Sequence, residues 1–229
     1  MKAGGDRRPR TPIRDAATLI ILRRETGEVV MGERSQGHVF YPEHYVFPGG
    51  RVDRQDGHAP AARELRPEVE QRLRSSATAR RARALALAAV RETFEEAGLI
   101  VGEPVNGMRP AGLSDDWRHF YDSGHAPALD RLTYIHRAVT PPGRPRRFNA
   151  RFFVIDAEHV RGDLSEGSGE LLKLHWVRLA DAQRLKLRPI TALVLKEIES
   201  RLAEDRLHDM SRPVPVVKTL YGRRVMEWD

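Results

Sequence analysis

The sequence predicts a mixed α/β fold, because strand-like and helix-like segments occur along the whole chain. Apolar runs at residues 15–22 (DAATLIIL) and 147–156 (RFNARFFVID) have the length and residue types of β-strands. Residues 180–204 instead repeat apolar side chains at helical spacing, and so does the stretch at residues 87–97. A chain that contains both kinds of element belongs to the α/β class.

Composition narrows the kind of protein. The 229 residues are enough for one substantial core, and a hydrophobic content of 40% excludes a disordered chain. The absence of cysteine excludes disulfides and thiolate metal sites. No apolar run is long enough to span a membrane, and the basic start MKAGGDRRPR is not followed by the apolar segment of a secretory signal. We therefore expect a cytoplasmic protein with a mobile tail at residues 1–12 and one domain at residues 13–229.

The net charge of +7 and the pI near 10.1 favour anionic partners. Nucleotides, nucleic acids and acidic membrane surfaces all meet this condition. Much of the excess charge lies in the N-terminal tail and in an arginine-rich stretch near residue 80, so charge alone does not choose among these partners.

The expected strands, in chain order, are residues 15–22, 28–33, 132–139, 147–156 and 170–177. On the fourth of them, Phe152 and Val154 face one side while Phe153 and Ile155 face the other. Two segments with helical composition are interrupted by proline: residues 61–74 by Pro67, and residues 180–204 near Pro189. The segment 113–126 has no clear pattern, and the chain beyond residue 213 is expected to be extended.

The stretch RETFEEAGLI at residues 91–100 is the most informative part of the sequence. Glu92, Glu95 and Glu96 stand at spacings i, i+3 and i+4, so they share one face of a helix. Thr78 is expected to cap the start of this helix, and Gly98 its end. Carboxylates this close repel one another unless a cation lies between them, and carboxylate oxygens are the ligands that Mg²⁺ and Mn²⁺ prefer. The alternative is a solvated acidic helix face.

A second motif, VFPGGRVDRQD at residues 46–56, precedes this helix. Together the two motifs resemble the Nudix hydrolases, whose signature is G-x5-E-x7-R-E-U-x-E-E-x-G-U with U an aliphatic residue. The matching positions are Gly50, Asp56, Arg91, Glu92, Glu95, Glu96, Gly98 and Leu99. The sequence departs from the signature in three ways: Asp56 replaces a glutamate, Thr93 takes an aliphatic place, and an insertion at about residues 57–84 separates the two halves.

The resemblance implies a Nudix-type α/β/α sandwich with a mixed central sheet and a helical insertion. It also implies hydrolysis of a pyrophosphate bond, with Mg²⁺ or Mn²⁺ held by Glu92, Glu95 and Glu96. The family resemblance makes Glu95 and Glu96 catalytic candidates and makes Glu166 and Glu170 candidates for the general base. In the family, the arginine at the Arg91 position orients the glutamates by ion pairing, and we expect its charge to keep their pKa values low.

The residues expected to bind substrate come from the same resemblance. The loop with Gly49 and Gly50 enters the site in this family. Arg34, Arg147 and Arg151 are candidates for substrate phosphates, with charges at strand ends as the alternative. Asp53 and Asp56 offer additional carboxylates or merely form a turn. The cluster Arg80, Arg81 and Arg83 is more typical of a solvated helix face than of a polyphosphate site.

Within the family, the split signature and the run RSQGHVFYPEHYVFPGG look most like the coenzyme A diphosphatase branch, although two residues of that branch's additional motif are missing. The small-molecule substrate could equally be ADP-ribose, NADH, a dinucleoside polyphosphate or a nucleoside triphosphate. A non-catalytic module that binds nucleotide or RNA is the alternative from a different class. The three glutamates and the absence of an aromatic–basic RNA motif argue against it. No membrane partner is expected, and a homodimer is left open.

Overall fold

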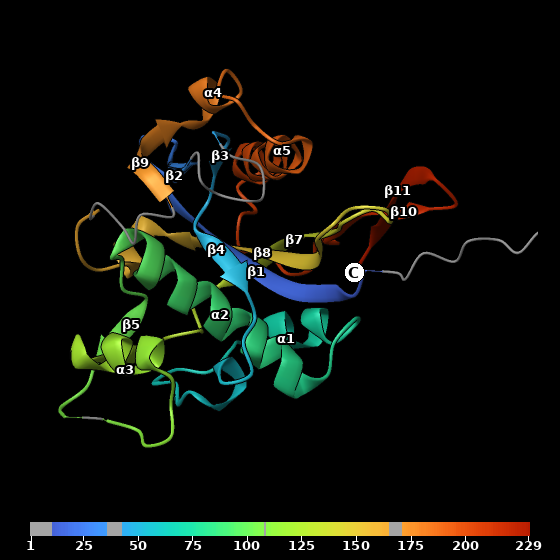
Figure 1. The fold of residues 1–229 in the computed structure, drawn as a ribbon. Coiled ribbons are helices and arrows are strands. Elements are labelled where there is room, and N and C mark those ends of the chain that lie inside the picture. The colour runs from blue at the N-terminus through green and yellow to red at the C-terminus, as the bar shows by residue number, and fades with distance from the viewer. Residues whose placement is uncertain (1–10, 36–42, 108, 165–170) are drawn as a thin grey trace, which may run out of the picture.

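A mixed β-sheet runs through the centre of the protein, with helices on both faces (Figure 1). The computed structural model describes residues 11–35, 43–107, 109–164 and 171–229. The strands are β1 (Ile13–Arg23), β2 (Glu28–Arg34), β3 (Tyr45–Val46), β4 (Gly49–Arg51), β5 (Gly102–Pro104), β6 (His125–Pro127), β7 (Thr133–Val139), β8 (Arg147–Asp156), β9 (Leu171–Arg178), β10 (Pro215–Leu220) and β11 (Arg223–Trp228). The helices are α1 (Pro67–Leu73), α2 (Ala79–Ala97), α3 (Asp115–Asp122), α4 (Leu179–Ala182) and α5 (Pro189–Ala203), with short 3₁₀ turns η1 (Asp56–His58) and η2 (Ala157–His159).

Strand β1 is the centre of the sheet, whose order is β11-β10-β7-β8-β1-β2-β3. It runs parallel to β8 and antiparallel to β2 and β4, and β9 pairs with β2. Parallel and antiparallel neighbours therefore occur in one sheet, which confirms the predicted mixed sheet. Strands β5 and β6 form a separate two-stranded sheet.

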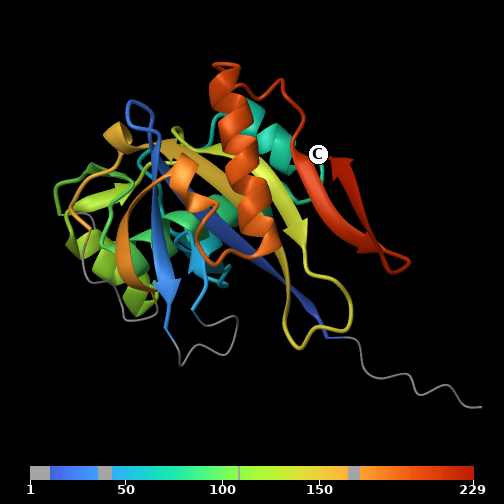
Figure 2. The same cartoon turned by 90° about the horizontal axis from the view of Figure 1, so that it is seen from above.

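The two faces of the sheet bury different helices. On β8, Phe153 and Ile155 pack into a core with α2, whereas Phe152 and Val154 pack into a second core with α5. This alternation confirms the facing predicted for these four side chains. Figure 2, viewed from above, shows α5 lying across one face of the sheet. The result is a three-layer α/β/α arrangement, as predicted.

Both helix-interrupting prolines turn out to begin helices. Pro67 is the first residue of α1 and Pro189 the first of α5. The sequence predicted an interruption at each proline, and the structure places a helix start there, because proline lacks the N–H that a helix interior needs but that the first turn does not. The segment that had no clear pattern contains α3, which starts after the N-cap Ser114. The expected extended end forms the hairpin of β10 and β11.

Helix α2 carries the second half of the signature, and its two ends are as predicted. The hydroxyl of Thr78 accepts a hydrogen bond from the backbone N–H of Arg81 at 3.3 Å. At the other end, Gly98 adopts a φ of +70°, and its N–H donates to the carbonyl of Phe94. Most of the helix is buried, and it packs along β1.

The insertion is packed into the fold. The side chains of Val69 and Leu73 are fully buried, and Arg83 donates to the carboxylate of Glu64. Of the arginine cluster, Arg80 is exposed, and Arg81 is 40% exposed while it bonds Asp15 at 2.6 Å, so these side chains form a partly solvated, ion-paired helix face. Within the described parts of the chain, no helix is long and apolar enough to cross a membrane. Residues 1–10 of the expected tail lie outside the described residues.

Candidate active site

A cleft of about 870 Å³ opens between α2, the β4 loop and the ends of β7, β8 and β10. One wall is acidic and consists of Asp53, Glu92, Glu95, Glu96 and Asp116. Basic side chains from five other segments line the same cleft: Arg34, Arg144, Arg146, Arg188, Lys218 and Arg224. A pocket with one acidic wall and many cations suits an anionic ligand that binds together with a metal ion.

The loop that contains Gly49 and Gly50 is hydrogen-bonded to the acidic wall of the cleft. The N–H of Gly49 donates to Oε2 of Glu96 at 2.7 Å. Gly49 has a φ of +150°, and a Cβ there would stand 2.5 Å from the carbonyl oxygen of Ala17. A Cβ on Gly50 would stand 2.4 Å from Oε2 of Glu92. Only glycine fits at position 49, and a side chain at position 50 would displace the Glu92 carboxylate, so the two glycines let the loop approach the carboxylates.

Arg91 is the centre of a buried network. Its guanidinium donates to Asp56 at 2.8 Å and 3.2 Å and to Glu95 at 2.9 Å. A third carboxylate, that of Glu92, lies 2.9 Å from Nη2. The Arg91 side chain is 4% exposed. Arg91 thus pairs with Glu92 and Glu95, two of the three box glutamates.

Burial reverses the pKa direction expected for two of these glutamates. It raises the pKa of Glu92 to about 7, and the charge of Arg91, which lowers this pKa, offsets only part of the shift. Burial also raises the pKa of Glu95. The expectation that Arg91 keeps both pKa values low was wrong, because removing a carboxylate from water costs more here than one ion pair returns.

Asp56 faces the interior, where its carboxylate is fully buried. Besides Arg91, it accepts hydrogen bonds from the N–H of Asp53 at 2.7 Å and from the indole Nε1 of Trp117 at 3.0 Å. Asp56 therefore positions the site from behind and does not line the cleft. Trp117 lies on α3, in the segment that the sequence left unassigned, and no motif links it to Asp56.

Comparison with known proteins agrees with this geometry. No family model matches the chain. A curated relative, putative nudix hydrolase 7 of Caenorhabditis elegans, is 28% identical over 151 residues, which cover 62% of this chain. The match spans 44% of that relative's length. The crystal structure of a NUDIX hydrolase from Alicyclobacillus acidocaldarius superposes with a TM-score of 0.63 at 28% identity and covers 84% of this chain and 96% of its own.

The chain is therefore similar to Nudix hydrolases in both sequence and fold. A mutator MutT protein from Bacillus halodurans covers 95% of this chain and 98% of its own at a TM-score of 0.51. Its identity of 12% makes this a likeness of fold alone.

The Nudix box of this chain has the chemistry of a divalent-metal site. Its three glutamates supply hard oxygen donors at one wall of the cleft, which suits Mg²⁺ or Mn²⁺. Their oxygens do not gather within 4.8 Å of one another in the described structure. The reason is visible in their partners, since Glu95 is turned to Arg91 and Glu96 to the N–H of Gly49.

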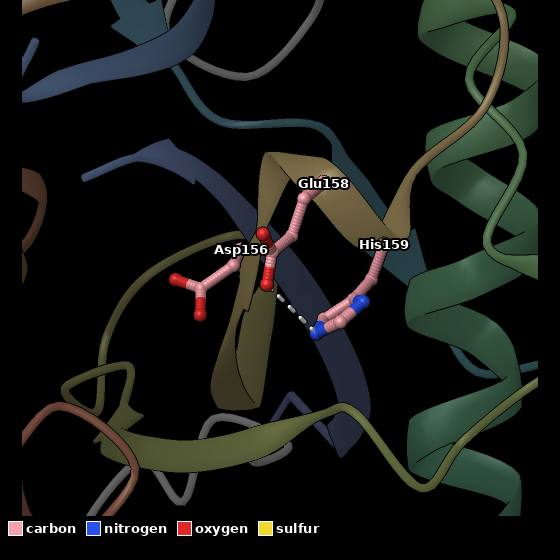
Figure 3. A group of neighbouring side chains, drawn as sticks. All are labelled: Asp156, Glu158 and His159. Atoms are coloured by element: carbon pink, nitrogen blue, oxygen red, sulfur yellow. Dashed lines mark ion pairs between the residues drawn. The ribbon is translucent and has the colours of Figure 1, made fainter. Parts of the chain in front are cut away.

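Such a gathering does occur elsewhere in the described residues, at Asp156, Glu158 and His159 (Figure 3). The two oxygens of Asp156 accept from Arg24 at 2.9 Å and from His208 at 2.8 Å. Glu158 pairs with His159 at 3.5 Å, as the dashed line in Figure 3 indicates. These carboxylates already have ion-pair or hydrogen-bond partners, so this group is less suited to a metal ion than the Nudix box.

Two side chains that were predicted to bind substrate phosphates do not line the cleft. Arg151 is 1% exposed and bonds Asp15 at 2.8 Å. The guanidinium of Arg147 donates to the carbonyls of Thr140 and Thr11 at 3.2 Å and 3.5 Å. Both side chains hold strand ends together, which was the alternative interpretation. Arg34, Gly49 and Gly50 do line the cleft.

Glu166 and Glu170, the predicted general bases, lie outside the described residues. The sequence alone did not indicate Asp116 or most of the basic side chains that line the cleft. Arg144 and Arg146 come from the β7–β8 loop, while Lys218 and Arg224 come from the β10–β11 hairpin. Side chains that meet only through the sheet order leave no local pattern in the sequence.

Proposed function

We propose that this protein hydrolyses a pyrophosphate bond in a nucleoside diphosphate linked to another moiety, with Mg²⁺ or Mn²⁺ as cofactor. One observation carries the proposal: the two halves of the split box meet at the cleft. There Gly49 donates to Glu96, and Gly50 approaches Glu92, although the insertion separates them in the sequence. The similarity to Nudix hydrolases supports the same reaction class.

Glu92, Glu95 and Glu96 would hold the divalent ion. When bound, such an ion neutralises phosphate oxygens and lowers the pKa of a water ligand. Glu95 would exchange its contact with Arg91 for the ion, and at 28% side-chain exposure it has access to the cleft. Arg91 and Asp56 perform no chemistry in this scheme. They keep the glutamates in place from the buried side.

The basic side chains opposite the glutamates would bind the phosphates. Arg34, Arg144, Arg146 and Arg188 line the cleft. Guanidinium groups match phosphate oxygens in geometry and charge. We therefore propose that this set, which includes Arg34, contacts the phosphates in place of Arg147 and Arg151. For the proton from the attacking water, Glu166 and Glu170 stay the proposed acceptors.

The rest of the cleft favours a leaving moiety with an apolar part. Phe148, Ile190, Leu193 and Val217 also line the cleft. Apolar lining of this kind stabilises a ligand by removing hydrocarbon from water. Coenzyme A or an acyl-CoA is the substrate that we propose on this basis. ADP-ribose, NADH and dinucleoside polyphosphates are the alternatives, because the box itself does not select the moiety. A cytoplasmic location and a homodimer are also proposed.

A substrate panel with product identification tests the proposal. Coenzyme A, an acyl-CoA, ADP-ribose, NADH, a diadenosine polyphosphate and the nucleoside triphosphates are each incubated with Mg²⁺ or Mn²⁺, and products are identified by mass spectrometry. Cleavage of coenzyme A to a phosphopantetheine product supports the proposed substrate. Cleavage of another compound of the panel supports the reaction and overturns coenzyme A or an acyl-CoA as the substrate. No cleavage, together with tight nucleotide binding, overturns the reaction in favour of a binding module.

A further inference from the structure

A second hollow of about 620 Å³ adjoins the cleft. The two share Arg51 and Asp53, which line both and form the wall between them. Four arginines line the second hollow, namely Arg14, Arg51, Arg54 and Arg81, and we call it the arginine pocket. None of the four was assigned to substrate by the sequence or by the reaction proposed above.

The carboxylates in the arginine pocket already have partners. Asp15 accepts from Arg81 through one oxygen at 2.6 Å and from the buried Arg151 through the other at 2.8 Å. Asp53 accepts from Arg51 at 2.9 Å. The acidic groups of the pocket are therefore already paired with Arg51, Arg81 and the buried Arg151.

The side chains of Arg14 and Arg54 are not paired with the carboxylates of the pocket. Among the described residues, neither guanidinium has a hydrogen bond or ion pair, and both residues are exposed. Two unpaired guanidiniums on one pocket suit a phosphate group.

We propose that the arginine pocket binds a phosphate group other than the pyrophosphate that is cleaved, through Arg14 and Arg54. One source is a phosphomonoester on the nucleoside of the substrate, because the shared Arg51–Asp53 wall allows one molecule to occupy both hollows. This source rests on the proposed function. The other source is free inorganic phosphate, which uses the same contacts.

Binding without turnover tests the pocket independently of the reaction. Titration calorimetry in a chelator compares 5′-AMP with adenosine 2′,5′-bisphosphate and adenosine 3′,5′-bisphosphate. The wild type is expected to bind one bisphosphate about tenfold more tightly than AMP, since charged hydrogen bonds at an exposed site have this strength. In the double variant Arg14→Gln/Arg54→Gln this ratio is expected to fall to about one. Arg131→Gln/Arg184→Gln removes the same charge from exposed side chains outside both hollows and should keep the ratio.

Inorganic phosphate distinguishes the two sources. If inorganic phosphate binds the wild type as tightly as the additional, second phosphate of a bisphosphate implies, and loses binding in the Arg14→Gln/Arg54→Gln variant, free phosphate is the ligand. If inorganic phosphate binds neither the wild type nor the double variant, while the wild type still prefers a bisphosphate to AMP, the phosphate belongs to the substrate. A bisphosphate ratio that persists in the double variant, or wild-type protein that prefers no bisphosphate and binds no phosphate, overturns the proposal. Because no step requires hydrolysis, failure of the substrate panel leaves this result unaffected.

Discussion

Asp56 and Arg91 form an ion pair with Nε and Oδ1 2.8 Å apart, and their side chains are 0% and 4% exposed. They stand 35 residues apart in the sequence, on the two sides of the insertion. The pair therefore joins the two halves of the Nudix box inside the protein. The shorter aspartate is sufficient here because Arg91, Trp117 and the N–H of Asp53 all reach it.

Replacing Arg91 by alanine should destabilise the protein strongly. The change leaves the buried carboxylate of Asp56 without its cation, which costs about 3–5 kcal/mol. We expect the melting temperature to fall by about 10 °C in calorimetry. Arg131→Ala, at an exposed position, is the matched control. A shift as small as that of the control would show that the pair does not hold the halves together.

Gly50→Ala should reduce activity more than stability. The new Cβ would meet the Glu92 carboxylate at 2.4–2.7 Å, and the flexible glutamate must move away from its place in the cleft. We expect kcat to fall by about 10²-fold with a soluble, folded protein. Gly57→Ala is the control, since its nearest contact would be an ordinary 3.6 Å. Equal activity of the two variants would contradict the close approach of loop and helix.

The sequence predicted the box helix, its caps and most strands because each depends on residues that are near one another in the chain. It failed where distant segments decide the outcome. The role of Arg151 follows from Asp15, which lies on the neighbouring strand β1. The basic wall of the cleft likewise depends on which strand ends meet. Trp117 could be assigned only once α3 was known to pack behind the box.

Trp117→Phe tests that packing. Phenylalanine keeps the ring contacts with Phe120 and Tyr121 but removes the N–H that Asp56 accepts. A buried acceptor that loses one donor costs about 1–3 kcal/mol, which urea unfolding can measure. Trp228→Phe, at 62% exposure, should change the unfolding free energy little. If Trp117→Phe matched this control, the indole hydrogen bond would have no role in the fold.

The raised pKa of Glu92 predicts a pH dependence in the metal-free protein. The usual value is 4.5 and the folded value about 7, so the folded state binds this proton more tightly than the unfolded state does. The stabilisation is present below pH 4.5 and is lost as the pH rises toward 7, by about 3 kcal/mol. Glu92→Gln should therefore lose less stability than the wild type between pH 4.5 and 7, as measured by calorimetry in a chelator. Parallel curves for the two proteins would contradict the shift.

The central claim is that the box glutamates support metal-dependent hydrolysis, and Glu96→Gln tests it most directly. Glutamine keeps an oxygen that can accept from Gly49 while removing the charge. With whichever substrate the wild type cleaves, Mg²⁺-dependent turnover of Glu96→Gln should fall by about 10²-fold or more, with an unchanged melting temperature. Glu103→Gln, at an exposed position on β5, should turn over normally. Wild-type turnover by Glu96→Gln would contradict the assignment of the site.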